Sequence, residues 1–312
     1  MNTKEQNRLI RDLGYRVINA INRVSVVTPH AVVASAILNL PADKFSFSEL
    51  LAINEIYLNC LTAQNAKMAD TLVADRRRAF EQVVDSYCQR KFIEPLAQGK
   101  AENSAEGLYL INESRRLNLE YYKNNSIAFF IPAAYTAMTI LEKDAFRFSA
   151  AELHTGYAFW QDFFKCEFAY DTENKPEFIV RKSIKVFIDN AIVVPHKTLP
   201  ETYDITPAAL RKLNLFALFL KTYFESYWIV LSYYKRNPHN SADSKDRLKK
   251  IAARGNRMYK RKEVDRRESL SKVSYQNAVE FFTGKGIKGS DDTEKIKVYE
   301  ETIQKALAHL RP

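Results

Sequence analysis

The sequence predicts a mainly α-helical protein, a multi-helix domain with short winged-helix-like β-hairpins. Apolar residues recur at helical spacing along most of the chain, and serine, threonine, aspartate or proline stands where several of these stripes begin. Only 8 of the 312 residues are glycine, which argues against a turn-rich all-β fold and against a glycine loop that binds phosphate. Hydrophobic residues make up 46% of the chain, enough to bury a full core without disulfides or metal.

The first part of the chain is expected to hold three helices. Thr28 and Pro29 are expected to cap and start the second helix, which ends near Pro41. Ser46 or Ser48 is expected to cap the third. The first helix is predicted from an apolar stripe that would form one buried face, made of Leu9, Leu13, Val17, Ala20, Ile21 and Val24.

The next segments have the order of a winged-helix module. Asp75 is expected to cap a helix from Arg76 to Lys91, and Leu108–Ile111 is expected to be an edge strand. Helices followed by a short strand are typical of winged-helix modules. Three arginines, Arg76, Arg77 and Arg78, open this helix, the third of the winged-helix-like module, where such modules contact nucleic acid. Nucleic acid is therefore a less favoured alternative partner.

A similar order recurs further along the chain. The elements expected there are helices at Ser149–Phe168 and Pro176–Asn190, and a small strand or wing at Ala191–Val194 and Thr202–Ile205. We therefore expect a first module over residues 1–145 and a second helical module over residues 146–312, although the two could form one continuous domain.

The last part of the chain is predicted to be helical. A long helix is expected from Pro207 to about Tyr234, where Asn237 and Pro238 would break it. A helix resumes at Ser241 or Ser244, and the chain closes with a helix over Asp291–Leu310.

Positive charge is concentrated in one segment. The formal net charge is +10, and residues 235–272 contain 14 Lys or Arg against 5 Asp or Glu, a balance of +9. On a helix, these cations would form a face suited to the phosphate groups of anionic lipid, so we predict an anionic membrane surface as a partner. A solvated helix or loop whose charges bind nothing specific would show the same pattern. The basic segment, as we call it, comprises Lys249, Lys250, Arg254, Arg257, Lys260, Arg261, Lys262, Arg266 and Arg267.

The sequence contains no familiar catalytic motif. It has no H-E-x-x-H, no G-x-S-x-G and no phosphate-binding P-loop. His196 has a carboxylate five positions on, Glu201, which could orient the imidazole as a general base in an acyltransferase that is active in its own right. A proline-flanked loop histidine explains the same residues without any chemistry.

The remaining composition predicts no metal site and no cofactor. Cys60, Cys88 and Cys166 are far apart in sequence and form no C-x-x-C pair, so we expect reduced thiols in a cytoplasmic protein. Residues 1–11 are polar and carry no secretory signal, and no stretch predicts a transmembrane helix.

Two blocks resemble one protein family. Arg11–Asn22 followed by Val26–Ala34 is similar to the Y-x-V-x-x-x-I-N … V-T-P-x-x-L-V-A block just downstream of the catalytic domain in bacterial and mitochondrial glycerol-3-phosphate acyltransferases. Leu119–Ile127 resembles that family's Y-Y-R-N-N segment. Weaker similarities lie at Phe163–Phe168 and Tyr223–Trp228, in the family's order. The resemblance extends over about residues 8 to 282.

The family's catalytic motifs are missing from this chain. No histidine is followed by aspartate in an H-x-x-x-x-D motif, and no E-G-T-R-S block occurs. The resemblance therefore implies a C-terminal helical domain without its catalytic domain, an auxiliary and membrane-docking part in phosphatidic acid biosynthesis. It implies a separate catalytic domain or subunit as partner and a peripheral location at the inner face of the cell membrane. The residues that it assigns to interdomain or ligand contacts are Arg11, Tyr15, Tyr121, Tyr122, Lys123 and Asn125.

Overall fold

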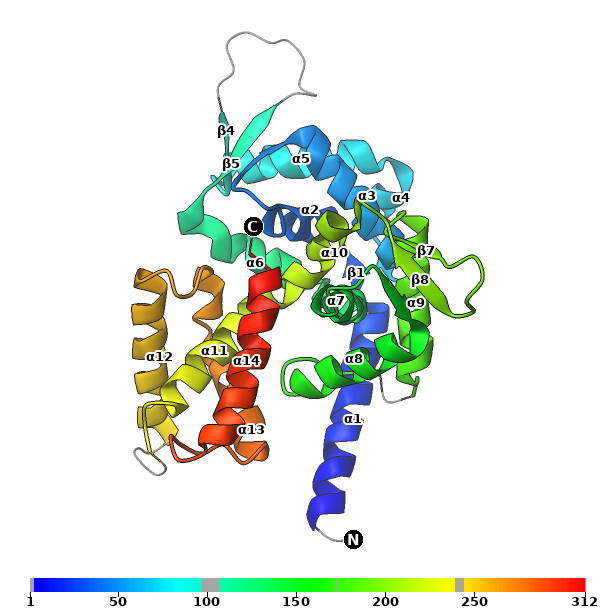
Figure 1. The fold of residues 1–312 in the computed structure, drawn as a ribbon. Coiled ribbons are helices and arrows are strands. Elements are labelled where there is room, and N and C mark those ends of the chain that lie inside the picture. Colours follow the sequence, from blue (N-terminus) through cyan, green and yellow to red (C-terminus); the bar gives the residue numbers. More distant parts are fainter. Residues whose placement is uncertain (1–2, 97–106, 172, 239–243, 312) are drawn as a thin grey trace.

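The computed structural model describes residues 3–96, 107–171, 173–238 and 244–311, and it is mainly α-helical (Figure 1). A long first helix, α1 (Thr3–Val24), extends away from the body, while α7 (Ile127–Glu142) lies near its centre. None of the described helices is both long enough and apolar enough to cross a membrane.

The first unit has the helix–strand–helix–helix–strand–strand order of winged-helix modules. Its antiparallel sheet has the strand order β2-β5-β4. A short parallel pair joins β1 (Val26–Val27), which precedes the first of its helices, to β3 (Lys67–Met68). A short helix, α4 (Asp70–Ala74), follows β3 in the chain. The principal elements are α2 (Pro29–Leu38), β2 (Lys44–Ser46), α3 (Phe47–Ala63), α5 (Arg76–Gln89), β4 (Ile93–Leu96) and β5 (Leu108–Ile111).

The second unit repeats this order. Its sheet has the matching strand order β6-β8-β7, so the expected recurrence of winged-helix-like hairpins is confirmed. The two units are joined by η2 (Glu113–Arg115) and α6 (Arg116–Asn124). The elements of the second unit are α7, β6 (Arg147–Ser149), α8 (Ala150–Phe163), α9 (Pro176–Asp189), β7 (Val193–Pro195) and β8 (Thr202–Ile205).

Equivalent positions in the two units have the same local chemistry. The Ser46 side chain accepts a hydrogen bond from the Glu49 N–H, and the Glu49 side chain accepts one from the Ser46 N–H; Ser149 and Glu152 form the same capping box. Lys91, after α5, and Ala191, after α9, both have left-handed φ angles, of 56° and 52°. The repeat is therefore present in the local sequence signals as well as in the topology.

The strand predictions need one correction. Leu108–Ile111 was expected at an edge, but β5 is the central strand of its sheet, between β2 and β4. The flanking strands are only three and four residues long, too short to give a clear alternating pattern. Prolines lie in the outer strands β4 and β7, at Pro95 and Pro195, as expected because proline has no backbone N–H to donate to a neighbouring strand.

The C-terminal helices follow the second unit. The predicted helix to Tyr234 is interrupted by a 3-10 turn, η3, which no proline or glycine marks in the sequence. The predicted Ser149–Phe168 helix ends earlier, at Phe163. Ser241 lies outside the described residues. The elements are α10 (Ala209–Ala217), η3 (Leu218–Leu220), α11 (Lys221–Tyr234), α12 (Ser244–Lys260), η4 (Arg267–Ser269), α13 (Lys272–Gly284) and α14 (Thr293–His309).

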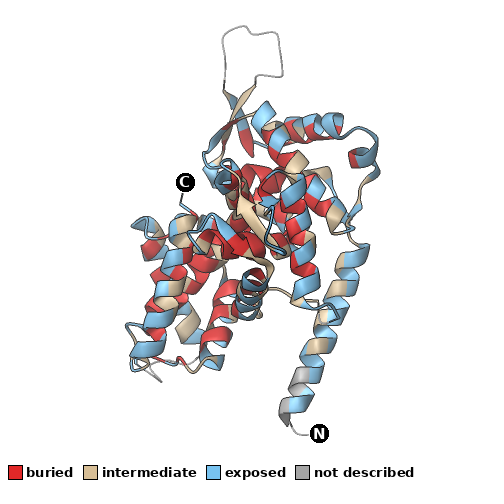
Figure 2. Ribbon diagram, turned by 45° about the vertical axis from the view of Figure 1, so that its right-hand side comes forward, coloured by how far each residue is buried: buried red, intermediate tan, exposed pale blue. Residues whose placement is uncertain are grey.

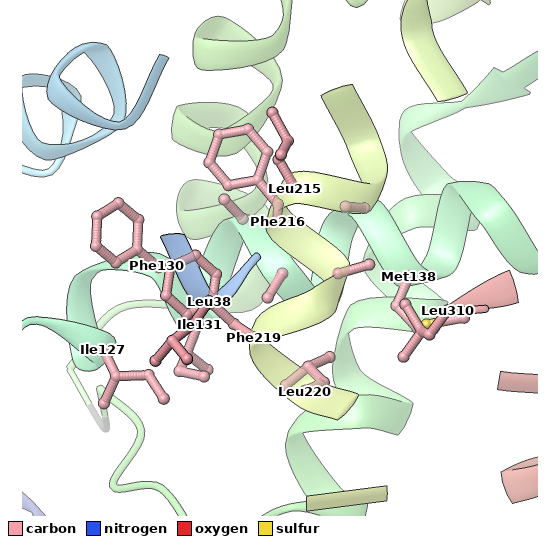
Figure 3. Packing of buried hydrophobic residues seen from close by; sticks show 14 of the residues in the cluster. Leu38, Ile127, Phe130, Ile131, Met138, Leu215, Phe216, Phe219, Leu220 and Leu310 are labelled. Atoms are coloured by element: carbon pink, nitrogen blue, oxygen red, sulfur yellow. The ribbon is translucent and has the colours of Figure 1, made fainter. Parts of the chain in front are cut away.

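Buried hydrophobic residues from Val27 to Leu310 form one cluster around α7. Side chains of α10 and η3 pack on those of α7 in its interior (Figure 3), where the rings of Phe130 and Phe219 stack with centroids 4.7 Å apart. Helix α8 approaches α7 so closely that a Cβ on Gly156 would lie 2.2 Å from a Thr139 methyl carbon. The core therefore joins both repeated units and the C-terminal helices.

Candidate docking interface

Helix α1 leaves its apolar face exposed, which corrects the prediction that this face is buried. The helix itself forms as predicted, but its large apolar side chains are 46% to 71% exposed, and its ribbon is mostly in the exposed colour in Figure 2. Sequence spacing identified most of this stripe but missed Ile10, which lies within it, and Ile18, which lies at its margin and also lines a groove beneath the helix. The α1 stripe, as we call it, comprises Leu9, Ile10, Leu13, Val17, Ile18, Ile21 and Val24.

The opposite face of α1 holds the helix against the body. The Tyr15 hydroxyl donates to the carbonyl oxygen of Lys165 at 2.5 Å, and the Tyr15 ring lies 4.7 Å from that of Tyr170. The Asn19 amide donates to the Tyr170 carbonyl at 3.0 Å. Burial raises the pKa of Tyr15 to about 12, so this hydroxyl remains a donor. Because the contacts lie on the polar side, the apolar side points away from the protein.

Further along α1, Arg23 approaches two carboxylates of the same segment, Asp171 at 3.7 Å and Glu173 at 3.5 Å. A groove of about 380 Å³ lies beneath this half of the helix and is lined by α1, α7 and the segment between α8 and α9. Glu167 lines it, and burial raises the pKa of this carboxyl to about 7. The amide of Asn277 donates to one of its oxygens at 2.9 Å, and the other oxygen is buried without a partner.

The residues of the second resembling block differ in their environments. The Tyr121 side chain is exposed, as is Asn125. Tyr122 is half-buried, packs against His30 and accepts a hydrogen bond from Arg90 at 2.7 Å. Arg11 is exposed on α1. These residues could still contact a partner, so that assignment stays a prediction for them.

Lys123 differs from the rest of this set because it is buried. Its side chain is 2% exposed and its ammonium lies 2.7 Å from the Glu120 carboxylate. A lysine buried at this depth needs such a partner, because an unpaired buried charge is costly. Lys123 therefore lies in the interior and cannot contact the surface of another domain directly, whereas its contact with a ligand stays a prediction.

The basic segment forms a cationic face on α12, with one exception. Lys249, Lys250, Arg257 and Lys260 are exposed on one side of the helix, and Arg261 and Lys262 are exposed just after it. Arg254 points inward instead, where it is 8% exposed and donates twice to the Ser232 hydroxyl, at 2.7 and 3.1 Å. It cannot contact a membrane. Arg266 and Arg267 lie apart from this face, at η4.

All three arginines that open α5 are exposed, and two of them pair with carboxylates. Arg76 lies 2.8 Å from Glu55, and Arg77 lies 3.1 Å from Glu81. Carboxylates beside these two cations reduce the positive potential that a DNA phosphate would meet. The winged-helix topology alone assigns no nucleic-acid function.

His196 lacks the arrangement of a general base. Its Nδ1 accepts hydrogen bonds from the backbone N–H groups of Thr198 and Leu199, at 3.2 and 3.1 Å. An accepting Nδ1 cannot donate to a carboxylate, so Glu201 does not orient this imidazole in the manner of a catalytic triad. Across the described ranges, no group of three His, Cys, Asp or Glu residues is placed to hold a metal ion.

Two comparisons with known proteins bear on this chain. A family model described as the glycerol-3-phosphate acyltransferase C-terminal region matches residues 1–291. No curated protein matches the sequence.

Proposed function

The chain belongs to the glycerol-3-phosphate acyltransferase C-terminal region family, and from this premise we propose that it is a non-catalytic docking domain for an acyltransferase catalytic domain. In this role it supports the acylation of glycerol 3-phosphate, the entry into phosphatidic acid synthesis. The catalytic domain would be the one that carries the H-x-x-x-x-D motif, which does not occur in these 312 residues.

The α1 stripe carries this proposal. Seven large apolar side chains lie exposed on a helix whose other face is fixed by hydrogen bonds and ion pairs. Contiguous apolar surface of this kind marks interaction sites in soluble proteins. Amphipathic helices bind partner proteins by placing residues at i, i+4 and i+7 or i+8 into an apolar groove, and Leu9, Leu13 and Val17 have this spacing.

An acyl-transfer assay tests the proposed role. Transfer from acyl-CoA or acyl carrier protein to glycerol 3-phosphate is measured for the purified chain, for the catalytic domain from the same genome, and for the two together. We expect the chain alone to be inactive and the mixture to exceed the catalytic domain alone. Activity of the chain alone that disappears in His196→Ala would contradict the proposal and favour the alternative of a site at His196 and Glu201.

The exposed face of α12 supports a second part of the proposal. In this part, the chain docks on the anionic lipid headgroups at the inner face of the cell membrane. Four cations share this face and only Asp246, which lies 3.8 Å from Lys249, faces them on the same helix. Each such cation near an anionic bilayer contributes about 1 kcal/mol. The attraction should therefore be strong at low salt and weak at high salt.

Liposome flotation tests membrane docking with two matched triple variants. Replacement of Lys249, Lys250 and Lys260 by Gln should release the chain from vesicles that contain phosphatidylglycerol. Replacement of Arg76, Arg77 and Arg78 by Gln removes the same charge elsewhere and should leave flotation intact. Equal loss in both variants, or flotation with neutral phosphatidylcholine vesicles, would contradict docking through α12.

A further inference from the structure

Five exposed residues of α1 follow the spacing of a coiled coil. They are separated alternately by three and four positions, the heptad pattern in which the first and fourth of seven residues are apolar. Gln6 continues this pattern toward the N-terminus but is polar, and α1 ends at Val24, so the pattern is bounded at both ends. The seam, as we call it, comprises Ile10, Leu13, Val17, Ala20 and Val24.

The seam faces away from the body of the protein. Tyr15 and Asn19 hold α1 against the body through their hydrogen bonds to the segment after α8. With about 3.6 residues per turn, the middle of the seam lies about half a turn around the helix from these two side chains. Because α1 also extends away from the body (Figure 1), a partner can reach the whole length of the seam.

The residue types in the seam favour one partner helix. Ile10, Val17 and Val24 occupy the first heptad position and are all β-branched, and Leu13 occupies the fourth. In parallel coiled coils, β-branched residues at the first position with leucine at the fourth favour two strands over three or four. From its first to its last residue the seam is about 21 Å long, which a helix of about four turns covers.

The positions beside the seam carry positive charge only. Arg23 approaches Asp171 and Glu173, whereas Arg16 is exposed and has no ion-pair partner in the part of the chain that the structure describes. Residues at these flanking positions form the salt bridges that select the partner of a coiled coil. Two copies of α1 could not form such bridges with each other, since the flanking residues are Leu9, Gly14, Arg16, Ile21 and Arg23. Charge complementarity therefore favours a different helix with an acidic flank.

The attachment of α1 to the body compensates for the shortness of the seam. About two heptads are too few for an independent coiled coil, because short helices are marginal in water. Here α1 is helical before it meets a partner, and Tyr15 and Asn19 fix its orientation. A pre-organised surface loses less conformational entropy on binding, so a short seam can suffice.

We propose that the catalytic domain places a single amphipathic helix of about four turns along the seam, with apolar residues at matching heptad spacing and an acidic residue beside Arg16. The identity of this partner rests on the proposed docking function, whereas the helical form of its docking element follows from the seam.

Two equally exposed leucines test whether the partner is a helix. Leu13 lies in the seam and Leu9 lies beside it, and each is 60% exposed. A helix in the seam covers Leu13 fully and Leu9 only at its edge. In calorimetric titration with the purified catalytic domain, Leu13→Ala should therefore weaken binding at least about 5-fold and Leu9→Ala less than about 2-fold.

Other results of this titration separate the two proposals. A wide groove would cover both leucines, so equal weakening in Leu9→Ala and Leu13→Ala would overturn the helical partner and leave docking through α1 intact. A complex that neither substitution weakens would contradict docking through α1 itself. Circular dichroism of the free variants excludes unfolding as the cause of a loss.

A charge reversal tests the acidic flank. Arg16→Glu should weaken binding about 3-fold at low salt, and the difference from the wild type should vanish at about 1 M NaCl. Arg78→Glu makes the same change at an exposed position on α5 and should leave the affinity unchanged. Equal weakening in both variants, or no weakening in Arg16→Glu, would overturn the acidic flank.

Sedimentation of the free chain tests whether a second copy occupies the seam. We expect Leu13→Ala to leave the oligomeric state of the free chain unchanged. A wild-type dimer that dissociates in Leu13→Ala would overturn the proposal, because the seam would then bind a second α1.

Discussion

Truncation of the α1 stripe gives the sharpest test of how this protein would bind its partner. The perturbation is the double variant Leu13→Ala with Val17→Ala. Leu13 is 60% exposed and Val17 is 52% exposed, so each side chain has about half of its surface available for a partner. Fully burying a leucine or valine side chain is worth about 1.5–3 kcal/mol, so covering the remaining half contributes about 1 kcal/mol for each residue.

The expected effect is therefore a loss of about 2 kcal/mol of binding free energy, which corresponds to an affinity about 30-fold weaker. The folding stability of the chain should change by less than about 0.5 kcal/mol, because both side chains are exposed in the free protein. Calorimetric titration with the purified catalytic domain measures the affinity, and urea unfolding of the free chain measures the stability.

A matched control separates a specific interface from general apolar contact. Leu210 on α10 is 56% exposed and Val298 on α14 is 59% exposed, so Leu210→Ala with Val298→Ala removes nearly the same exposed surface elsewhere. The control should retain wild-type affinity. If the α1 variant binds as well as the wild type, or if the control loses as much affinity, then α1 is not the docking element.

Three further predictions concern stability and the attachment of α1. Burial raises the Glu167 pKa to about 7 from 4.5, so the stabilising contribution of the protonated carboxyl is complete below pH 4.5 and is lost as pH rises through 7. Glu167→Gln should therefore reduce the fall in the free energy of unfolding, measured with urea, between pH 5 and 8 by up to about 3 kcal/mol. An unchanged fall would contradict the raised pKa of Glu167. Gly156→Ala would force a Cβ against Thr139 and should lower the free energy of unfolding by about 1–3 kcal/mol. Gly14→Ala is the control, because a Cβ at Gly14 on α1 meets open space, and it should raise the free energy of unfolding by up to about 1 kcal/mol. Tyr15→Phe removes one of the hydrogen bonds that fix α1 to the body and should speed amide exchange in α1 with little change in global stability. Unaltered exchange would show that this bond does not contribute to holding the helix.

The repeated architecture could be predicted from the sequence because its signals are local. Thr28 accepts a hydrogen bond from the Ala31 N–H, and Asp75 accepts one from the Arg78 N–H, as their positions before the helices predict. The outer strands β2 and β6 could not be predicted, because three residues give no usable alternation and their pairing depends on contacts with strands about 60 residues away.

Burial was harder to predict than secondary structure. The periodicity of α1 is the same whether its apolar face meets the core of this chain or another molecule, so the spacing of its apolar residues could not distinguish the two. In the basic segment, Arg254 lies on the inward face of α12 with Ile251 and Met258, and it donates there to Ser232 of α11, a partner that the charge pattern could not indicate. Arg266 and Arg267, which the charge pattern grouped with the membrane face, line cavities that form only when α6, α11 and η4 meet.

Hydrogen–deuterium exchange of the chain with and without the catalytic domain tests the docking proposal most directly. Amides of an exposed helix exchange through local opening, and a partner that covers the helix suppresses that opening. We predict that peptides from α1 become protected in the complex while those from α12 and α14 remain unchanged. A complex that forms with no change in α1 exchange, or with protection confined to other elements, would contradict docking through the α1 stripe.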